Sequence, residues 1–112
     1  MQLLTKKITE MAHKQYPKGS DFDQMVVAKF FDAFGSWSWY LMNIDPADDD
    51  YCWGIVKGFE VEMGSFLMSE LKSLKVKPCE QGNLVLRIER DLYFKPTKAK
   101  VIWDKLLAGE HV

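Results

Sequence analysis

Hydrophobic positions near the N-terminus recur at helical spacing. Ile8, Met11 and Ala12 fall on one side of a helix drawn over residues 5–16, which is typical of an amphipathic helix with a narrow buried stripe. Thr5 is suited to cap its first turn through the side-chain hydroxyl. The Pro-Lys-Gly sequence that follows is expected to end it.

From residue 25 onward the apolar pattern changes to that of β-strands. Segments rich in β-branched and aromatic residues cover 25–31, 37–44 and 51–59, with turn-forming residues between them. Gly54 and Gly58 interrupt the third segment, where a bulge or a close approach of another backbone is expected. Short turns between successive strands favour an antiparallel meander.

The second half of the chain predicts shorter elements. We expect a fourth strand over 60–66, a helix over 70–74 capped by Ser69, a loop over 77–83, a strand over 84–88, a short element or strand continuation over 92–94, and a helix capped by Thr97 that ends at Gly109. Helix, then strands, then helix predicts a single α+β domain over residues 1–112. Its sheet would be antiparallel, meander-like and of three to five strands, with N-terminal and C-terminal flanking helices.

Composition agrees with a folded domain. Of 112 residues, 47% are hydrophobic and 13% aromatic, which is ample for one core. No apolar run is long enough for a membrane span, and the first residues lack the features of a signal peptide, so a cytoplasmic protein is expected. Cys52 and Cys79 are expected to be reduced core residues rather than a disulfide.

The net charge indicates no particular class of partner, but the charged residues are unevenly distributed along the chain. The formal net charge is −1, whereas residues 72–105 contain nine basic and four acidic residues. A nucleic-acid-associated protein that uses this basic C-terminal third is therefore kept as an alternative function. Its phosphate contacts would come from Lys72, Lys75, Lys77, Arg87, Lys95, Lys98 and Lys100.

Three tryptophans form a candidate surface for stacking nucleic-acid bases: Trp37, Trp39 and Trp53. Few basic residues are interleaved with them, and aromatic side chains of neighbouring strands usually fill the core. The core interpretation is favoured, while their exposure is left open.

Acidic residues and histidines offer only weak candidates. Asp45, Asp48, Asp49 and Asp50 lack the ligand spacing of a calcium loop and are expected to form a solvated turn. Glu60 and Glu62 could be a carboxylate pair or the guard of a sheet edge. His13 and His111 have no partner at metal-ligand spacing.

The most informative polar cluster is Glu89, Arg90 and Asp91, which lies between two apolar runs. The planar guanidinium of Arg90 could clamp a carboxylate or phosphate of a partner. The favoured alternative is an internal ion pair with Asp91, Glu60 or Glu62 that ties strands together.

Several segments together resemble a known family. They are LLTK (3–6), VAKFF (27–31), WSWY (37–40), GIVKGFE (54–60), SEL (69–71) and IERDLYF (88–94). This order resembles a small domain-of-unknown-function family common on plasmids, phages and integrative elements. The resemblance covers about residues 3–96, so the helix over 97–109 is treated as a candidate addition. It implies accessory work for mobile DNA, such as counter-defence or conjugation support, and supplies no catalytic residues.

The leading hypothesis is therefore a non-enzymatic protein-interaction module in the cytoplasm, acting for a mobile genetic element. The surface proposed for the protein partner consists of Lys57, Glu60, Arg90 and Asp91. No catalytic, cofactor-binding or metal-binding residue is predicted, and no cofactor is expected. A homodimer formed through sheet edges is left open.

Overall fold

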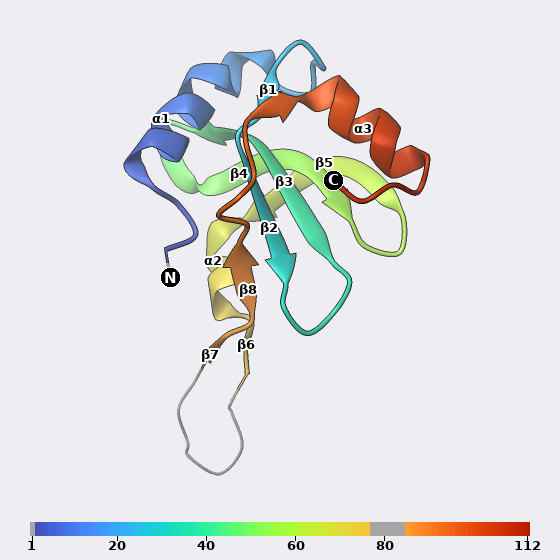
Figure 1. The fold of residues 1–112 in the computed structure, drawn as a ribbon. Coiled ribbons are helices and arrows are strands. Elements are labelled where there is room, and N and C mark those ends of the chain that lie inside the picture. Colours follow the sequence, from blue (N-terminus) through green and yellow to red (C-terminus); the bar gives the residue numbers. More distant parts are fainter. Residues whose placement is uncertain (1, 77–84) are drawn as a thin grey trace.

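A five-stranded antiparallel sheet lies at the centre of the structure (Figure 1). The structure is a computed structural model, and it describes residues 2–76 and 85–112. The strands of this sheet are β2 (Ala28–Asp32), β3 (Ser38–Asp45), β4 (Asp48–Lys57), β5 (Val61–Leu67) and β8 (Ile88–Arg90). The helices are α1 (Lys6–Gln15), α2 (Met68–Ser73) and α3 (Ala99–Leu107), with a 3₁₀ turn, η1 (Tyr16–Lys18), after α1. Two small ladders pair β1 (Met25–Val26) with β9 (Thr97–Lys98), and β6 (Lys75–Val76) with β7 (Val85–Leu86).

The strand order in the main sheet is β5-β4-β3-β2-β8. Strands β2 to β5 pair with their sequence neighbours, so the predicted α+β fold with an antiparallel meander is confirmed. Strand β8 returns from the C-terminal part of the chain and pairs with β2 at the other edge. No local pattern predicted that pairing, because the two strands are far apart in the chain.

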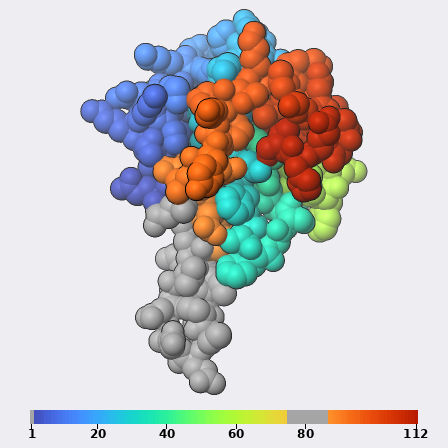
Figure 2. All heavy atoms as spheres, viewed as in Figure 1, coloured from blue at the N-terminus to red at the C-terminus, as the bar shows by residue number. Residues whose placement is uncertain are grey.

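Apolar side chains fill both faces of the sheet. On one face, α1 and α2 contribute Ala12, Met68 and Leu71 to a core around Phe30 and Leu41. On the other face, α3 covers a second core through the side chains of Ala99, Ile102 and Leu106. Figure 1 shows α1 and α3 flanking the strands, and Figure 2 shows the orange C-terminal segment filling the surface between them.

Strand β3 is buried on both faces and has an irregular register with β4. Leu41 pairs with Gly54, but Asn43 pairs with Trp53, so Met42 is an extra residue on β3. Such a bulge reverses the alternation of side chains beyond it. It is the reason that Ile44, three residues after Leu41, faces the same core as Leu41.

The first predicted strand, 25–31, is in fact two. Val27 and Ala28 are adjacent in sequence and both contribute to the α1-side core, which breaks the alternation of a continuous strand. The two residues before the break form β1 and pair with β9 instead. The prediction of one strand was wrong because local propensity does not show which neighbour each part will meet.

Helix termini were predicted with mixed success. The Thr5 hydroxyl accepts a hydrogen bond from Ile8 N at 3.2 Å, as expected of an N-cap, and Gly109 has a positive φ of 78° just beyond α3. Ser69 does not cap α2 but lies inside it, and Thr97 lies in β9 with its hydroxyl bonded to Lys95 O. Those two caps were predicted wrongly.

Other boundaries differ by several residues. Strand β4 begins at Asp48, so much of the predicted turn over 45–50 belongs to strands. No helix or strand forms over 92–94. The predicted loop over 77–83 and Cys79 lie outside the described residues. No helix in the described part of the chain is long and apolar enough to cross a membrane.

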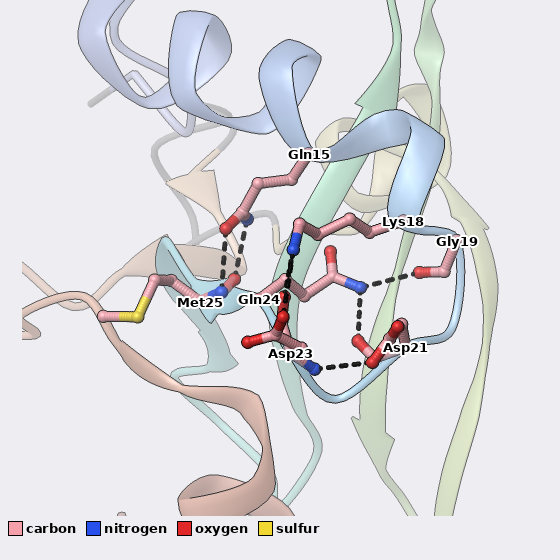
Figure 3. Close-up of polar contacts among 7 residues, drawn as sticks. All are labelled: Gln15, Lys18, Gly19, Asp21, Asp23, Gln24 and Met25. Atoms are coloured by element: carbon pink, nitrogen blue, oxygen red, sulfur yellow. Dashed lines mark hydrogen bonds and ion pairs between the residues drawn. The ribbon is translucent and has the colours of Figure 1, made fainter.

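Side-chain amides fasten the end of α1 to the sheet (Figure 3). Gln15 donates from Nε2 to Met25 O at 2.8 Å and to Met42 O at 2.7 Å, while Met25 N donates back to its Oε1 at 2.8 Å. Nearby, Asn43 Nδ2 donates to Oε1 of the buried Gln24 at 3.0 Å. These bonds satisfy backbone groups at the break in the first strand, and we assign the cluster a structural role.

Candidate functional site

The four residues proposed as a partner surface lie on two separate parts of the sheet. Lys57 is on β4 and Glu60 in the turn after it, whereas Arg90 and Asp91 lie at the opposite edge, in and after β8. Two strands separate β4 from β8, which corresponds to roughly 14 Å across the ladder. The two parts also face different ways, because Lys57 lines a hollow beside the end of α3 and Arg90 one beside α1.

At the β8 edge the polar cluster is drawn into the structure. Arg90 is half-buried. Asp91 N donates to Lys29 O at 2.9 Å, and the Asp91 carboxylate accepts a hydrogen bond from Tyr93 N at 2.9 Å. The Asp91 contacts hold the chain where it leaves the sheet.

An ion pair that was not predicted joins β2 to the residue before β8. Arg87 Nε lies 2.9 Å from both carboxylate oxygens of Asp32, which is buried, and Phe34 N donates to the same carboxylate at 2.9 Å. The hydrogen bond from Arg87 holds the pKa of the Asp32 carboxyl below its usual range. Because 55 residues separate the pair in the chain, no local sequence signal marks it.

This ion pair also bears on the predicted phosphate contacts. Arg87 was one of the residues assigned to nucleic acid, and its guanidinium is already bound to Asp32. Of the lysines in that group, Lys77 and the side chain of Lys75 lie outside what the structure describes. The others are exposed: Lys72, Lys95, Lys98 and Lys100. Lys100 pairs with Asp104 at 2.9 Å and lies over the ring of Phe22.

The acidic turn serves the fold. Asp50 accepts hydrogen bonds from Ser69 N at 2.6 Å and Ser69 Oγ at 2.8 Å, which anchors the first turn of α2. Asp49 Oδ1 lies 2.6 Å from Nε2 of His13 on α1. Among residues 2–76 and 85–112, no group of histidine, cysteine and acidic side chains is arranged to hold a metal ion.

The three tryptophans do not form one stacking surface. Trp39 is buried in the α1-side core, and Trp37 lies on the same side of the sheet but is 37% exposed. Trp53 pairs with Asn43 beyond the bulge, and alternation along β4 places it on the α3 side. Of the three, Trp37 is the one exposed to solvent, at the end of the sheet where the β2–β3 and β4–β5 turns meet, whereas Trp53 is half-buried.

Trp37 belongs to an exposed aromatic group at that end. Its ring lies 6.1 Å from Trp39 and 5.5 Å from Phe59, the latter edge-on, and Phe59 is 95% exposed. Gly58 lies directly beneath the Trp37 ring, because a Cβ there would come within 2.4 Å of it. The predicted close approach of another backbone is found at Gly54, whereas at Gly58 the close neighbour is this side-chain ring.

A groove extends from this aromatic group between β5 and α2. Its main hollow has a volume of about 470 Å³, and a smaller one of about 300 Å³ continues it around Phe59. The two hollows share Trp37, Val56 and Glu62. We call this region the β5 groove; its lining is Trp37, Trp39, Val56, Gly58, Phe59, Glu60, Glu62, Met63, Gly64, Ser65, Phe66, Glu70, Leu71, Ser73 and Leu74.

The charge of the β5 groove has one sign. Glu60, Glu62 and Glu70 line it, and the described part of its lining contains no lysine or arginine. Glu60 and Glu62 were considered as a catalytic pair, but both are exposed at the rim. Sequence reasoning missed the groove as a unit, because the helix wall and the sheet floor meet only in the folded chain.

A comparison with protein-family models matches residues 2–109 to the family described as "Protein of unknown function (DUF2958)". The chain belongs to this family. The match to DUF2958 includes all three helices and the whole central sheet. The resemblance to a family of unknown function is thereby confirmed. No curated protein and no solved structure matched the chain.

Proposed function

We propose that this DUF2958 protein is a non-enzymatic protein-interaction module whose docking surface is the β5 groove. The observation that carries the proposal is the exposed Trp37 and Phe59 beside a concave surface of about 470 Å³. Large exposed aromatic side chains supply much of the binding energy at protein interfaces. Helices α1 and α3 pack on the two cores of the sheet, whereas the rings of Trp37 and Phe59 stay exposed to a partner.

The expected partner segment is positively charged. Among the residues that the structure describes, three glutamates and no basic residue line the groove, so an arginine-rich or lysine-rich segment matches its charge. Trp37 adds an aromatic face on which a guanidinium or ammonium group can lie. Charge and aromatic surface thus select the same class of partner.

The lining supports binding more readily than catalysis. Its described residues supply carboxylates and the hydroxyls of Ser65 and Ser73, but among them is no histidine, cysteine or lysine that would complete a nucleophile–base pair. The open shape also leaves water free to enter, which weakens the electrostatic effects that catalysis uses. A binding role is consequently the simpler use of these residues.

The cellular setting forms part of the same proposal and rests on the resemblance described above. We place the protein in the cytoplasm of a cell that carries a mobile genetic element. There it would bind a protein of the host or of the element, in counter-defence or in support of conjugation.

The experiment begins with capture of partners from a host lysate and their identification by mass spectrometry. A captured partner is then purified, and its affinity is measured for the wild type, Glu62→Lys and Glu10→Lys. Glu10 is exposed on α1 and outside the groove, so it controls for the change in net charge. We expect Glu62→Lys to weaken binding at least tenfold and Glu10→Lys to leave it unchanged. Equal affinity for all three proteins would refute the groove as the docking surface.

A further inference from the structure

We infer that the partner binds as an extended segment that adds a strand to the free edge of β5, with a basic side chain placed between Trp37 and Glu62. This inference rests on the proposed function and specifies how the groove is used. In such strand addition, main-chain hydrogen bonds provide affinity and alternate side chains provide specificity.

The first support is the position of β5 in the sheet. It is an edge strand of seven residues, bonded to β4 on one side, and no other described strand pairs with its outer side. The opposite edge, β8, has only three residues. An edge of this length is normally protected by charged side chains, above all lysine, by proline or by a covering element. Strand β5 contains no lysine or proline, and its one charged residue is Glu62, which guards the edge against acidic segments but attracts a basic one.

The second support is the way in which the groove meets this strand. Five consecutive residues of β5, from Glu62 to Phe66, line the main hollow. Successive side chains of a strand point to opposite faces of the sheet. A hollow that touches all five therefore contacts the main chain of β5 as well as the side chains on one face, so a segment bound at this strand has its backbone within reach.

The third support is the register of the residues that face the floor of the groove. Glu62, Gly64 and Phe66 pair with Val56, Gly54 and Cys52 of β4, and so lie on the α1 side of the sheet. A Cβ added at Gly64 would meet nothing within 4 Å, which shows open space at the middle of the strand. An added strand can place an apolar side chain near Phe66 and a basic one near Glu62.

The basic side chain has a defined environment at the Glu62 end. Val56 pairs with Glu62 on one side and with Trp39 on the other, so Glu62 is in line with the tryptophan that Trp37 contacts. Trp37 and Phe59 present two rings at 82° to one another, with Glu60 and Glu62 at the rim of the same hollow. Aromatic faces combined with carboxylates favour a guanidinium or ammonium group.

The test uses fluorescein-labelled peptides and fluorescence anisotropy with the full chain. The parent peptide alternates arginine with valine, and a control alternates glutamate with valine. Two further peptides carry N-methyl groups on alternate residues of the parent, one on each set of amides, which removes hydrogen-bond donors from one edge of the strand at a time. We expect the parent to bind, the glutamate peptide not to bind, and one methylated peptide to bind at least tenfold more weakly than the other.

Equal binding of the parent and both methylated peptides would overturn strand addition, because no backbone donor would then be used. Failure of the arginine peptide to bind would also overturn strand addition by a partner segment. If light scattering then shows that the protein is a dimer, the edge is assigned to a second copy of the chain. The proposed function fails by a different result, namely equal affinity of a purified partner for Glu62→Lys and wild type.

Discussion

Replacement of Gly54 by alanine is expected to disrupt the centre of the sheet. The new Cβ would lie 2.0 Å from Tyr40 O and 3.0 Å from its carbonyl carbon, across the β3–β4 ladder. Both are backbone atoms, so no side-chain rotation relieves the clash and the strands must move apart by about 1 Å. Overpacking of this kind costs about 3 kcal/mol of unfolding free energy, at the upper end of the usual range.

Gly64 provides a matched control, because it is the register partner of Gly54 on β5. Its backbone does not have a positive φ, and a Cβ there meets nothing within 4 Å. Gly64→Ala removes conformational freedom from the unfolded chain and is expected to stabilise the protein by about 0.5 kcal/mol. The same substitution in the same row of the sheet should therefore have opposite effects.

Urea unfolding followed by far-UV circular dichroism measures both free energies. A loss of about 3 kcal/mol in Gly54→Ala corresponds to a fall in melting temperature on the order of 10–20 °C. If the unfolding free energy of Gly54→Ala lies within about 0.5 kcal/mol of the wild-type value, the close approach of the two strands at Gly54 is refuted. If Gly64→Ala loses as much as Gly54→Ala, the effect is a general property of glycine in these strands and not of the contact with Tyr40.

Three further predictions concern single side chains. The pKa of Asp32 is lowered by its hydrogen bond from Arg87, so the ionised carboxylate stabilises the fold above its unfolded-state pKa of about 3.9, and this contribution is lost as the pH falls below that value. Urea midpoints between pH 3 and 6 should therefore fall more steeply for the wild type than for Asp32→Asn, and parallel curves would contradict this. Burial raises the pKa of the Cys52 thiol to about 12, so iodoacetamide should not label it at pH 8 in folded Cys79→Ser protein but should label it in urea; rapid labelling of the folded protein would be evidence against burial. Phe59 is 95% exposed, so Phe59→Ala should change the unfolding free energy by less than about 0.5 kcal/mol. The same variant should bind the arginine–valine peptide about two- to fivefold more weakly than the wild type, and an unchanged affinity would show that Phe59 is not part of the site.

Local patterns were sufficient to predict most of the fold. The amphipathic spacing after Thr5, the alternating strands and the turn-forming residues between them predicted the helix and four consecutive strands. Gly54 was correctly identified as a point where another backbone approaches, whereas Gly58 makes room for the side chain of Trp37. These features depend on residues within a few positions of one another, because backbone propensity, capping and side-chain alternation are short-range effects.

The tertiary structure decided the features that depend on distant pairs. Strand β8 lies beside β2, and Arg87 is bound to Asp32, although 55 residues separate the two side chains. The predicted partner residues Lys57 and Arg90 lie on different faces, because Lys57 is in register with Ser38 and Phe31 whereas Arg90 pairs with Phe30, one position along β2.

The β5 groove illustrates the same limit for function. Its floor comes from three strands, its wall from α2, and its exposed rings from two different turns. Each of these residues alone is compatible with an ordinary core or surface position. The sequence by itself determined that aromatic and acidic residues are available, whereas the packing of α2 against the sheet decided that they line one concave surface beside a free strand edge.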